Sequence, residues 1–205
     1  MSERYEIVYL DPPWPRTPCG TAKTPYATMT WEELHAFDLG QWLAPDCVVF
    51  CWLTGPTHLK ECAVLSTWCN RFKLHEAGIA YRWIKTTKAG VPIGASGPRP
   101  KLVKQLGEDV IALTSRKRGR VFPLLTEAQV QWCSDDGIVE ACEVRAPKVL
   151  RGEHSRKPAI VRTKIVELLG DRPRIEVFAR EVVSGWHGFG NEYPAHARLD
   201  ARAGE

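Results

Sequence analysis

The chain lacks the features that would place it in a membrane, repeat or coiled-coil class. No apolar run in its 205 residues approaches the roughly 18 needed to cross a bilayer. The first ten residues are typical of a strand rather than of a hydrophobic leader. No internal repeat, heptad array or domain-dividing linker is visible. We therefore expect one soluble, cytoplasmic domain without membrane contact.

Cysteine is present, but in no spacing typical of a metal or redox centre. The seven cysteines include no C-x-x-C pair, which is the spacing of zinc ribbons and thiol redox sites. Most stand in apolar surroundings, where a free thiol behaves as a small hydrophobic side chain. We expect reduced core cysteines and no metal, and a metal site is the less favoured alternative.

The net charge of +4 is too small to identify a nucleic-acid-binding protein by itself. Its distribution is more informative, because cations punctuate a stretch rich in Gly and Pro at 86–108 and cluster at 116–120. Spaced cations in loops suit phosphate contacts, although solvated surface is an equal alternative for any one of them. The residues expected to bind nucleic acid are Lys85, Lys88, Lys101, Arg116, Lys117, Arg118 and Arg120.

Short apolar segments alternate with helical segments along the chain. Strands are expected at residues 6–10, 47–54, 79–85, 109–114 and 174–179, with an edge strand at 139–144. Helices are expected at 30–42, opened by a capping box, at 59–69, at 158–169 and, briefly, from Thr126. This alternation predicts an α/β fold with a doubly wound, mainly parallel sheet. We expect a single domain over 1–192 and a polar tail over 193–205.

The most informative segment is Asp11-Pro12-Pro13-Trp14, directly after the strand at 6–10. The carboxyl ends of strands in open α/β sheets are where ligands bind. Each proline fixes φ and lacks an N–H, so the chain leaves the strand in a defined direction. The carbonyls of Asp11 and Pro12 are then acceptors, and Trp14 offers a flat apolar face. An amino group on a planar heterocycle requires such acceptors and a stacking surface.

Two further polar clusters stand at the end of a strand or the start of a helix. One is His154–Pro158, and the other runs from Glu176–Arg180 to Gly190–Glu192. All three clusters would open onto one crevice in a doubly wound sheet. No Gly-x-Gly-x-x-Gly follows any predicted strand, so that dinucleotide fingerprint supports no nucleotide site here.

In their order, these motifs resemble the MT-A70 family of S-adenosylmethionine-dependent adenine methyltransferases, in its compact bacterial or phage form. Six motifs in one order over nearly the whole chain are far more specific than any one of them. They are the Asp11–Trp14 segment, Tyr26-x-x-Met29, Trp83-Ile84-Lys85, His154-Ser155-x-Lys157-Pro158, Phe178-x-Arg180 and Gly190-Asn191-Glu192. The resemblance implies a Rossmann-like sheet of permuted order, with the catalytic strand first and the cofactor strand near the end. It also implies the cytoplasm of a bacterial or phage-infected cell.

The resemblance also implies the role of each site residue. Asp11, Pro12, Pro13 and Trp14 would be catalytic, with Asp11 and the Pro12 carbonyl accepting the hydrogens of the adenine amine. Trp14 would stack on the base or flank it. S-adenosylmethionine would be the methyl donor and S-adenosylhomocysteine the product. The residues expected to bind this cofactor are Asp11, Lys157, Phe178, Arg180, Asn191 and Glu192.

Several alternatives stay open at this point. DNA adenine is the expected substrate, while RNA adenosine, a cytosine amine or a non-catalytic nucleic-acid-binding scaffold are the alternatives. The protein would be a monomer or a homodimer. Trp14 could instead be a core tryptophan, and Lys157 a solvated residue at a helix start. Arg180 could pair with Glu176 or Glu181 on the surface.

Overall fold

The computed structural model describes residues 4–15, 27–55, 57–86, 89, 107–116, 143–147, 157–191 and 193–194. Several sequence predictions lie outside these ranges. They are the helix from Thr126, the His154 part of its cluster, the cofactor residue Glu192, most of the tail, and the nucleic-acid residues Lys88, Lys101, Lys117, Arg118 and Arg120.

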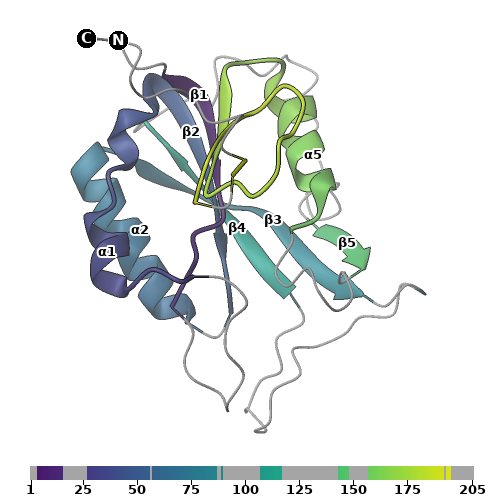
Figure 1. Ribbon diagram of the computed structural model, residues 1–205, viewed down its shortest axis with the longest axis horizontal. Coiled ribbons are helices and arrows are strands. Elements are labelled where there is room, and N and C mark those ends of the chain that lie inside the picture. Colours follow the sequence, from purple (N-terminus) through teal and green to yellow (C-terminus); the bar gives the residue numbers. More distant parts are fainter. Residues whose placement is uncertain are drawn as a thin grey trace, which may run out of the picture.

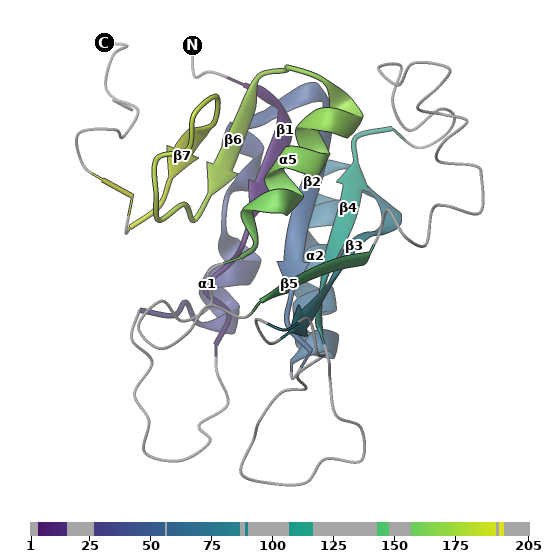
Figure 2. The same cartoon turned by 90° about the vertical axis from the view of Figure 1, so that its right-hand side faces the viewer.

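The described residues form an α/β structure with one seven-stranded sheet in the order β5-β3-β4-β2-β1-β6-β7. Helices α1 and α2 cover one face of this sheet, and α5 covers the other (Figures 1 and 2). The strands are β1 (Tyr5–Leu10), β2 (Leu43–Leu53), β3 (His75–Thr86), β4 (Gly107–Thr114), β5 (Glu143–Pro147), β6 (Arg174–Val177) and β7 (His187–Phe189). The helices are α1 (Trp31–Ala36), α2 (His58–Phe72) and α5 (Ala159–Leu169), and a 3₁₀ turn spans Leu39–Gln41.

The sheet is mainly parallel, as the sequence predicts, and β4 is the strand that makes it mixed. Strand β1 pairs in parallel with β2 and β6, but β4 runs antiparallel to both β2 and β3. Leu53, at the end of β2, is therefore opposite Asp109, near the start of β4. The first residues of β4 thus lie at the sheet edge where β1, β2, β3 and β6 end.

Helix α1 begins as predicted but is shorter than predicted. The Thr30 amide donates to Glu33 Oε2 at 2.7 Å and the Glu33 amide to Thr30 Oγ1 at 3.1 Å, which confirms the capping box. The helix ends at Ala36 because Asp38 opens a new turn, its carboxylate accepting from the Gly40 amide at 3.2 Å. Strand β7 was not predicted, since its three residues lie in a segment rich in Gly and aromatics.

The hydrophobic core has two halves, one on each face of the sheet. Val8 and Leu10 of β1 pack in the cluster that includes Val64 and Trp68 of α2. Ile7 and Tyr9 pack in the cluster that includes Val161 and Ile165 of α5. A strand covered on both faces is apolar throughout, which explains why β1 and β2 appear in the sequence as continuous apolar runs. Among the described residues, no helix is long and apolar enough to cross a membrane.

The chain turns sharply where β6 ends. Phe178 has φ +65°, a left-handed conformation that non-glycine residues rarely adopt. The Ala179 amide donates to the Phe189 carbonyl at 3.0 Å, which brings β7 alongside this turn. A Cβ on Gly190 would lie 2.3 Å from the Ala179 carbonyl oxygen, so only glycine allows the approach. This contact places Asn191 beside the carboxyl end of β6.

The first prediction concerns this close approach. Substitution Gly190→Ala should lower the free energy of unfolding by about 1–3 kcal/mol, because backbone atoms must move to admit the new methyl group. Urea unfolding followed by circular dichroism measures the change. A free energy within about 0.5 kcal/mol of the wild-type value, the range of ordinary surface changes, would contradict the contact.

Candidate active site at the carboxyl edge of the sheet

Three of the predicted site residues meet where β1 and β6 end. Asp11 follows β1, Lys157 precedes α5, and Arg180 follows β6. Lys157 Nζ lies 3.1 Å from Asp11 Oδ1, and an Arg180 guanidinium nitrogen lies 3.6 Å from Asp11 Oδ2. The Lys157 side chain is only 7% exposed, so the alternative of a solvated lysine is wrong.

Glu108 completes this cluster, and sequence reasoning missed it. Lys157 Nζ donates to Glu108 Oε2 at 2.6 Å, and Lys85 Nζ pairs with the other carboxylate oxygen, Oε1. If β4 ran parallel to its neighbours, as in a fully parallel sheet, it would begin at the opposite edge of the sheet. The antiparallel direction of β4 instead brings Glu108 beside Asp11. The sequence shows an acidic residue just before the strand predicted at 109–114, but not at which edge of the sheet that strand begins.

The two carboxylates of the cluster have pKa values shifted in opposite directions. Burial raises the pKa of Asp11, and Lys157 offsets this only in part. Burial would also raise the pKa of Glu108, but Lys157 and Lys85 together lower it to about 2. Burial disfavours the charged form of Lys157, yet Asp11 and Glu108 raise its pKa above the usual range. Glu108 is thus ionised at neutral pH as the partner of the two lysines, and Asp11 is the carboxylate that protonates more readily.

The residues after Asp11 are held by hydrogen bonds. The Trp14 amide donates to the Pro12 carbonyl at 2.7 Å, and the Met29 amide donates to the Pro13 carbonyl at 3.0 Å. The Trp14 indole donates to the Trp52 carbonyl at 3.0 Å, and its side chain is buried in the core. The Pro12 carbonyl keeps one lone pair for a ligand. The structure thus gives Trp14 the core position considered as its alternative, and base stacking stays a prediction.

A second missed residue, Glu61, holds the turn after β2. Its buried carboxylate accepts from the Thr54 amide at 2.7 Å and from Thr57 Oγ1 at 2.5 Å, and it also pairs with Thr54 Oγ1. Burial raises the pKa of Glu61, while these hydrogen bonds lower it. This turn begins two residues after Trp52, whose carbonyl accepts the hydrogen bond from the Trp14 indole.

Arg162 of α5 was also missed, and it bears on the alternative considered for Arg180. Its guanidinium pairs with Glu176 and with Glu181, each at 2.7 Å. Arg162 is buried although arginine rarely is, and its place on the inner face of α5 was the available signal. Arg180 approaches Asp11, as described above.

The two remaining cofactor residues that the structure describes lie at the same edge. Phe178 is half-buried, and its ring centroid lies 4.8 Å from that of Phe37. Asn191 is exposed beside the turn after β6. In the part of the chain that the structure describes, no group of three or more His, Cys, Asp and Glu residues could hold a metal ion.

The two described members of the nucleic-acid set lie at opposite edges of the sheet. Lys85 belongs to the cluster around Glu108. Arg116 pairs with Asp46 near the amino end of β2, its Nε donating at 2.7 Å. The structure therefore does not bring them together, and phosphate contact stays a prediction for both.

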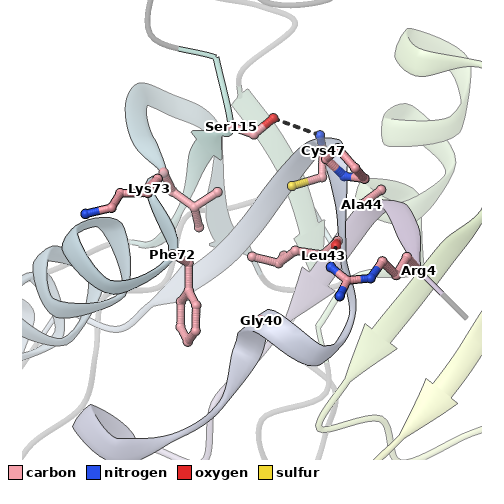
Figure 3. Close-up of a pocket in the computed structure, with 10 residues that line it drawn as sticks. Arg4, Gly40, Leu43, Ala44, Cys47, Phe72, Lys73 and Ser115 are labelled. Carbon is pink, nitrogen blue, oxygen red and sulfur yellow. Dashed lines mark hydrogen bonds between the residues drawn. The ribbon is translucent and has the colours of Figure 1, made fainter. Parts of the chain in front are cut away.

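A cavity of about 330 Å³ also lies at the amino edge, away from Asp11. Residues that line it include Arg4, Leu43, Phe72 and Cys47 (Figure 3). The Cys47 amide donates a hydrogen bond to Ser115 Oγ at 3.0 Å. Burial raises the pKa of the Cys47 thiol to about 11, which disfavours the reactive thiolate. This cavity holds none of the predicted site residues.

Comparison with known proteins gives one family and several distant relatives. A model of the MT-A70 family matches residues 5–192. The chain is 24% identical to the type II methyltransferase M.MunI of a Mycoplasma species, over 94% of this chain and 79% of that protein. It is 27% identical to the N6-methyladenosine RNA methyltransferase MTA1 of Pyricularia oryzae, over 92% of this chain and 46% of that protein. It is 22% identical to the human N(6)-adenine-specific methyltransferase METTL4, over 96% of this chain and 39% of that protein.

The lowered pKa of Glu108 gives the second prediction. Its ionised form stabilises the fold above the unfolded pKa near 4.5, and this contribution is lost as the pH falls toward about 2. The wild-type protein should have a larger free energy of unfolding than Glu108→Gln, by at most about 3 kcal/mol above this window. This difference should shrink as the pH falls through the window. Urea unfolding at several pH values measures it.

A matched control for this experiment is Glu76→Gln, which changes an exposed carboxylate on β3. Its difference from wild type should vary little over the same window. If the difference in free energy of unfolding between wild type and Glu108→Gln were equally independent of pH, the ion pairs of Glu108 with the two lysines would not contribute to stability.

Proposed function

The chain belongs to the MT-A70 family, and from this premise we propose that it methylates the exocyclic amine of adenine in DNA at specific sites. S-adenosylmethionine supplies an electrophilic methyl group bound to a sulfonium. The observation that carries the proposal is the mostly buried Asp11 carboxylate, held between Lys157 and Arg180 at the carboxyl end of β1. An order in which the catalytic strand β1 comes first and the cofactor strand β6 near the end, side by side in the sheet, fits the permuted Rossmann-like form.

Asp11 would act by hydrogen bonding and by its charge. The adenine amine is a weak nucleophile because its lone pair is delocalised into the ring. Asp11 and the free lone pair of the Pro12 carbonyl would accept its two hydrogens and favour a pyramidal nitrogen. Such catalysis relies on positioning and electrostatics and forms no covalent enzyme intermediate. The raised pKa of Asp11 also suits its carboxylate to receive the proton released by the methylated nitrogen.

The charges at this edge fit a ligand that carries both an ammonium and a carboxylate. Lys157 would pair with the carboxylate of the methyl donor, and Asp11 would lie near its ammonium. Phe178 would pack against the cofactor, with Arg180 and Asn191 near the ribose hydroxyls and Glu192 near the ribose or adenine. In support, Asp11, Glu108, Lys157 and Arg180 already form mutual ion pairs that such a ligand could exchange.

DNA is favoured over RNA by the extent of the similarity. The chain spans 79% of M.MunI, a type II methyltransferase, but less than half of the RNA methyltransferase MTA1 of Pyricularia oryzae. A role in restriction and modification would follow from the likeness to M.MunI. An RNA adenosine substrate is the alternative activity within the family. A nucleic-acid-binding scaffold without catalytic activity is the alternative that is not an enzyme.

The third prediction tests substrate and catalysis together. Cells that express the wild-type protein should gain N6-methyladenine in their DNA, measured by mass spectrometry of nucleosides from DNA and RNA digested separately. Substitution Asp11→Ala should lower this gain by at least about 100-fold, as removal of one preorganised charge or hydrogen-bonding group does in other enzymes.

The control for this experiment is Asp171→Ala, because the Asp171 side chain is 91% exposed and far from the site in the sheet. It should keep wild-type methylation. Methylated adenosine found only in RNA would support the alternative substrate. Unchanged methylation in Asp11→Ala would rule out the role assigned to Asp11.

The fourth prediction separates an enzyme from a scaffold. Isothermal calorimetry should detect S-adenosylhomocysteine binding to the wild-type protein, and Lys157→Ala should weaken it by at least about 10-fold, since a charge-assisted hydrogen bond contributes about 1.5–3 kcal/mol. The control variant Lys164→Ala, on helix α5 that follows Lys157, should bind normally. Absence of binding to the wild-type protein would favour the scaffold.

A further inference from the structure

The Lys157 ammonium has a neighbour besides its two carboxylates. Its Nζ lies 5.1 Å from the centroid of the Trp52 ring, over the face of the indole. A cation over this face is attracted by the negative charge of the π system. Lys157 therefore takes its position from three groups: Asp11, Glu108 and the indole. The orientation of that indole is therefore one of the three factors that set the position of the ammonium.

The Trp52 indole is held from its edge by a tyrosine hydroxyl. Its Nε1–H donates to the Tyr9 hydroxyl at 2.5 Å, and the Trp52 side chain is completely buried. The ring also meets Trp83 edge-on, with centroids 6.1 Å apart and planes at 81°. A buried N–H without an acceptor is costly, so the Tyr9 hydroxyl favours this one orientation of the ring.

Tyr9 is itself fixed in the core. It belongs to β1, two residues before Asp11, and packs in the cluster covered by α5. Its ring lies edge-on to Trp186, with centroids 5.8 Å apart. Burial raises the pKa of Tyr9, so its hydroxyl stays neutral and can accept the indole N–H over the whole working range of pH.

We propose that Tyr9 is a positioning residue whose hydroxyl orients Trp52, so that the indole holds the Lys157 ammonium ready for the carboxylate of the methyl donor. Neither Tyr9 nor Trp52 touches the reacting atoms in this arrangement. The inference rests on the proposed function, because it takes Lys157 as the residue that binds the cofactor. Without the Tyr9 hydroxyl, the indole would turn toward another acceptor and its face would leave Lys157.

The fifth prediction uses Tyr9→Phe, which removes the hydroxyl and keeps the ring. Calorimetry with S-adenosylhomocysteine should show affinity weakened by about 3- to 10-fold, the range expected from a disturbed cation–π contact. Tyr5→Phe is the matched control. Tyr5 lies on the same strand, is equally buried, and its hydroxyl is bonded to His187 Nδ1 at 2.7 Å. The control should lose comparable stability yet bind S-adenosylhomocysteine within about 2-fold of wild type.

A double substitution separates positioning from general destabilisation. In a Lys157→Ala background, Tyr9→Phe should change the affinity by less than about 2-fold, because residues that act through one contact are not additive. If Tyr9→Phe does not fold, Trp52→Phe removes the same hydrogen bond from its donor side and should weaken binding of the same ligand. A full additional loss in the double variant, or wild-type affinity in Tyr9→Phe, would overturn the inference. Failure of the wild-type protein to bind would overturn the proposed function itself.

Discussion

The buried ammonium of Lys157, shared by Asp11 and Glu108, is the interaction on which the rest of this site depends. A buried charge is costly unless it is paired, and here one lysine pairs with carboxylates from two different strands. The three residues come from the end of β1, the start of β4 and the entry to α5. They meet only because β1 ends and β4 begins at one edge of the sheet. The electrostatics of the site therefore depend directly on the topology of the sheet.

Local patterns in the sequence were sufficient for the parts of the site that depend on local structure. Asp11 was expected at the end of a buried strand and Lys157 just before a helix, and both lie there because a continuous apolar run and a proline at a helix start are local signals. The direction of β4 is not a local property. An apolar run of six residues pairs equally well either way, so Glu108 could not be placed at this edge from the sequence.

Side-chain partners were also beyond the sequence wherever they depend on packing between distant elements. The flat ring of Trp14 predicts a stacking surface. In the structure its indole N–H donates to the Trp52 carbonyl, and the ring packs in the core. Arg162 of α5 forms ion pairs with Glu176 and Glu181, the two acidic residues that the sequence offers as partners for Arg180. Each of these outcomes is decided by how a helix or loop lies on the sheet, which residue spacing alone does not specify.

The pKa of Glu108 is lowered and that of Asp11 is raised, which indicates different roles for the two carboxylates. Glu108 lies between two ammonium groups that lower its pKa to about 2, so it is ionised at neutral pH and balances the charge of the lysines. Asp11 has the raised pKa and two cations that a ligand carboxylate could take over. When paired acids in one site are shifted apart in this way, the difference usually marks different roles. Glu108 is thus suited to hold the lysines in place, which agrees with the separate role proposed for Asp11 at the adenine amine.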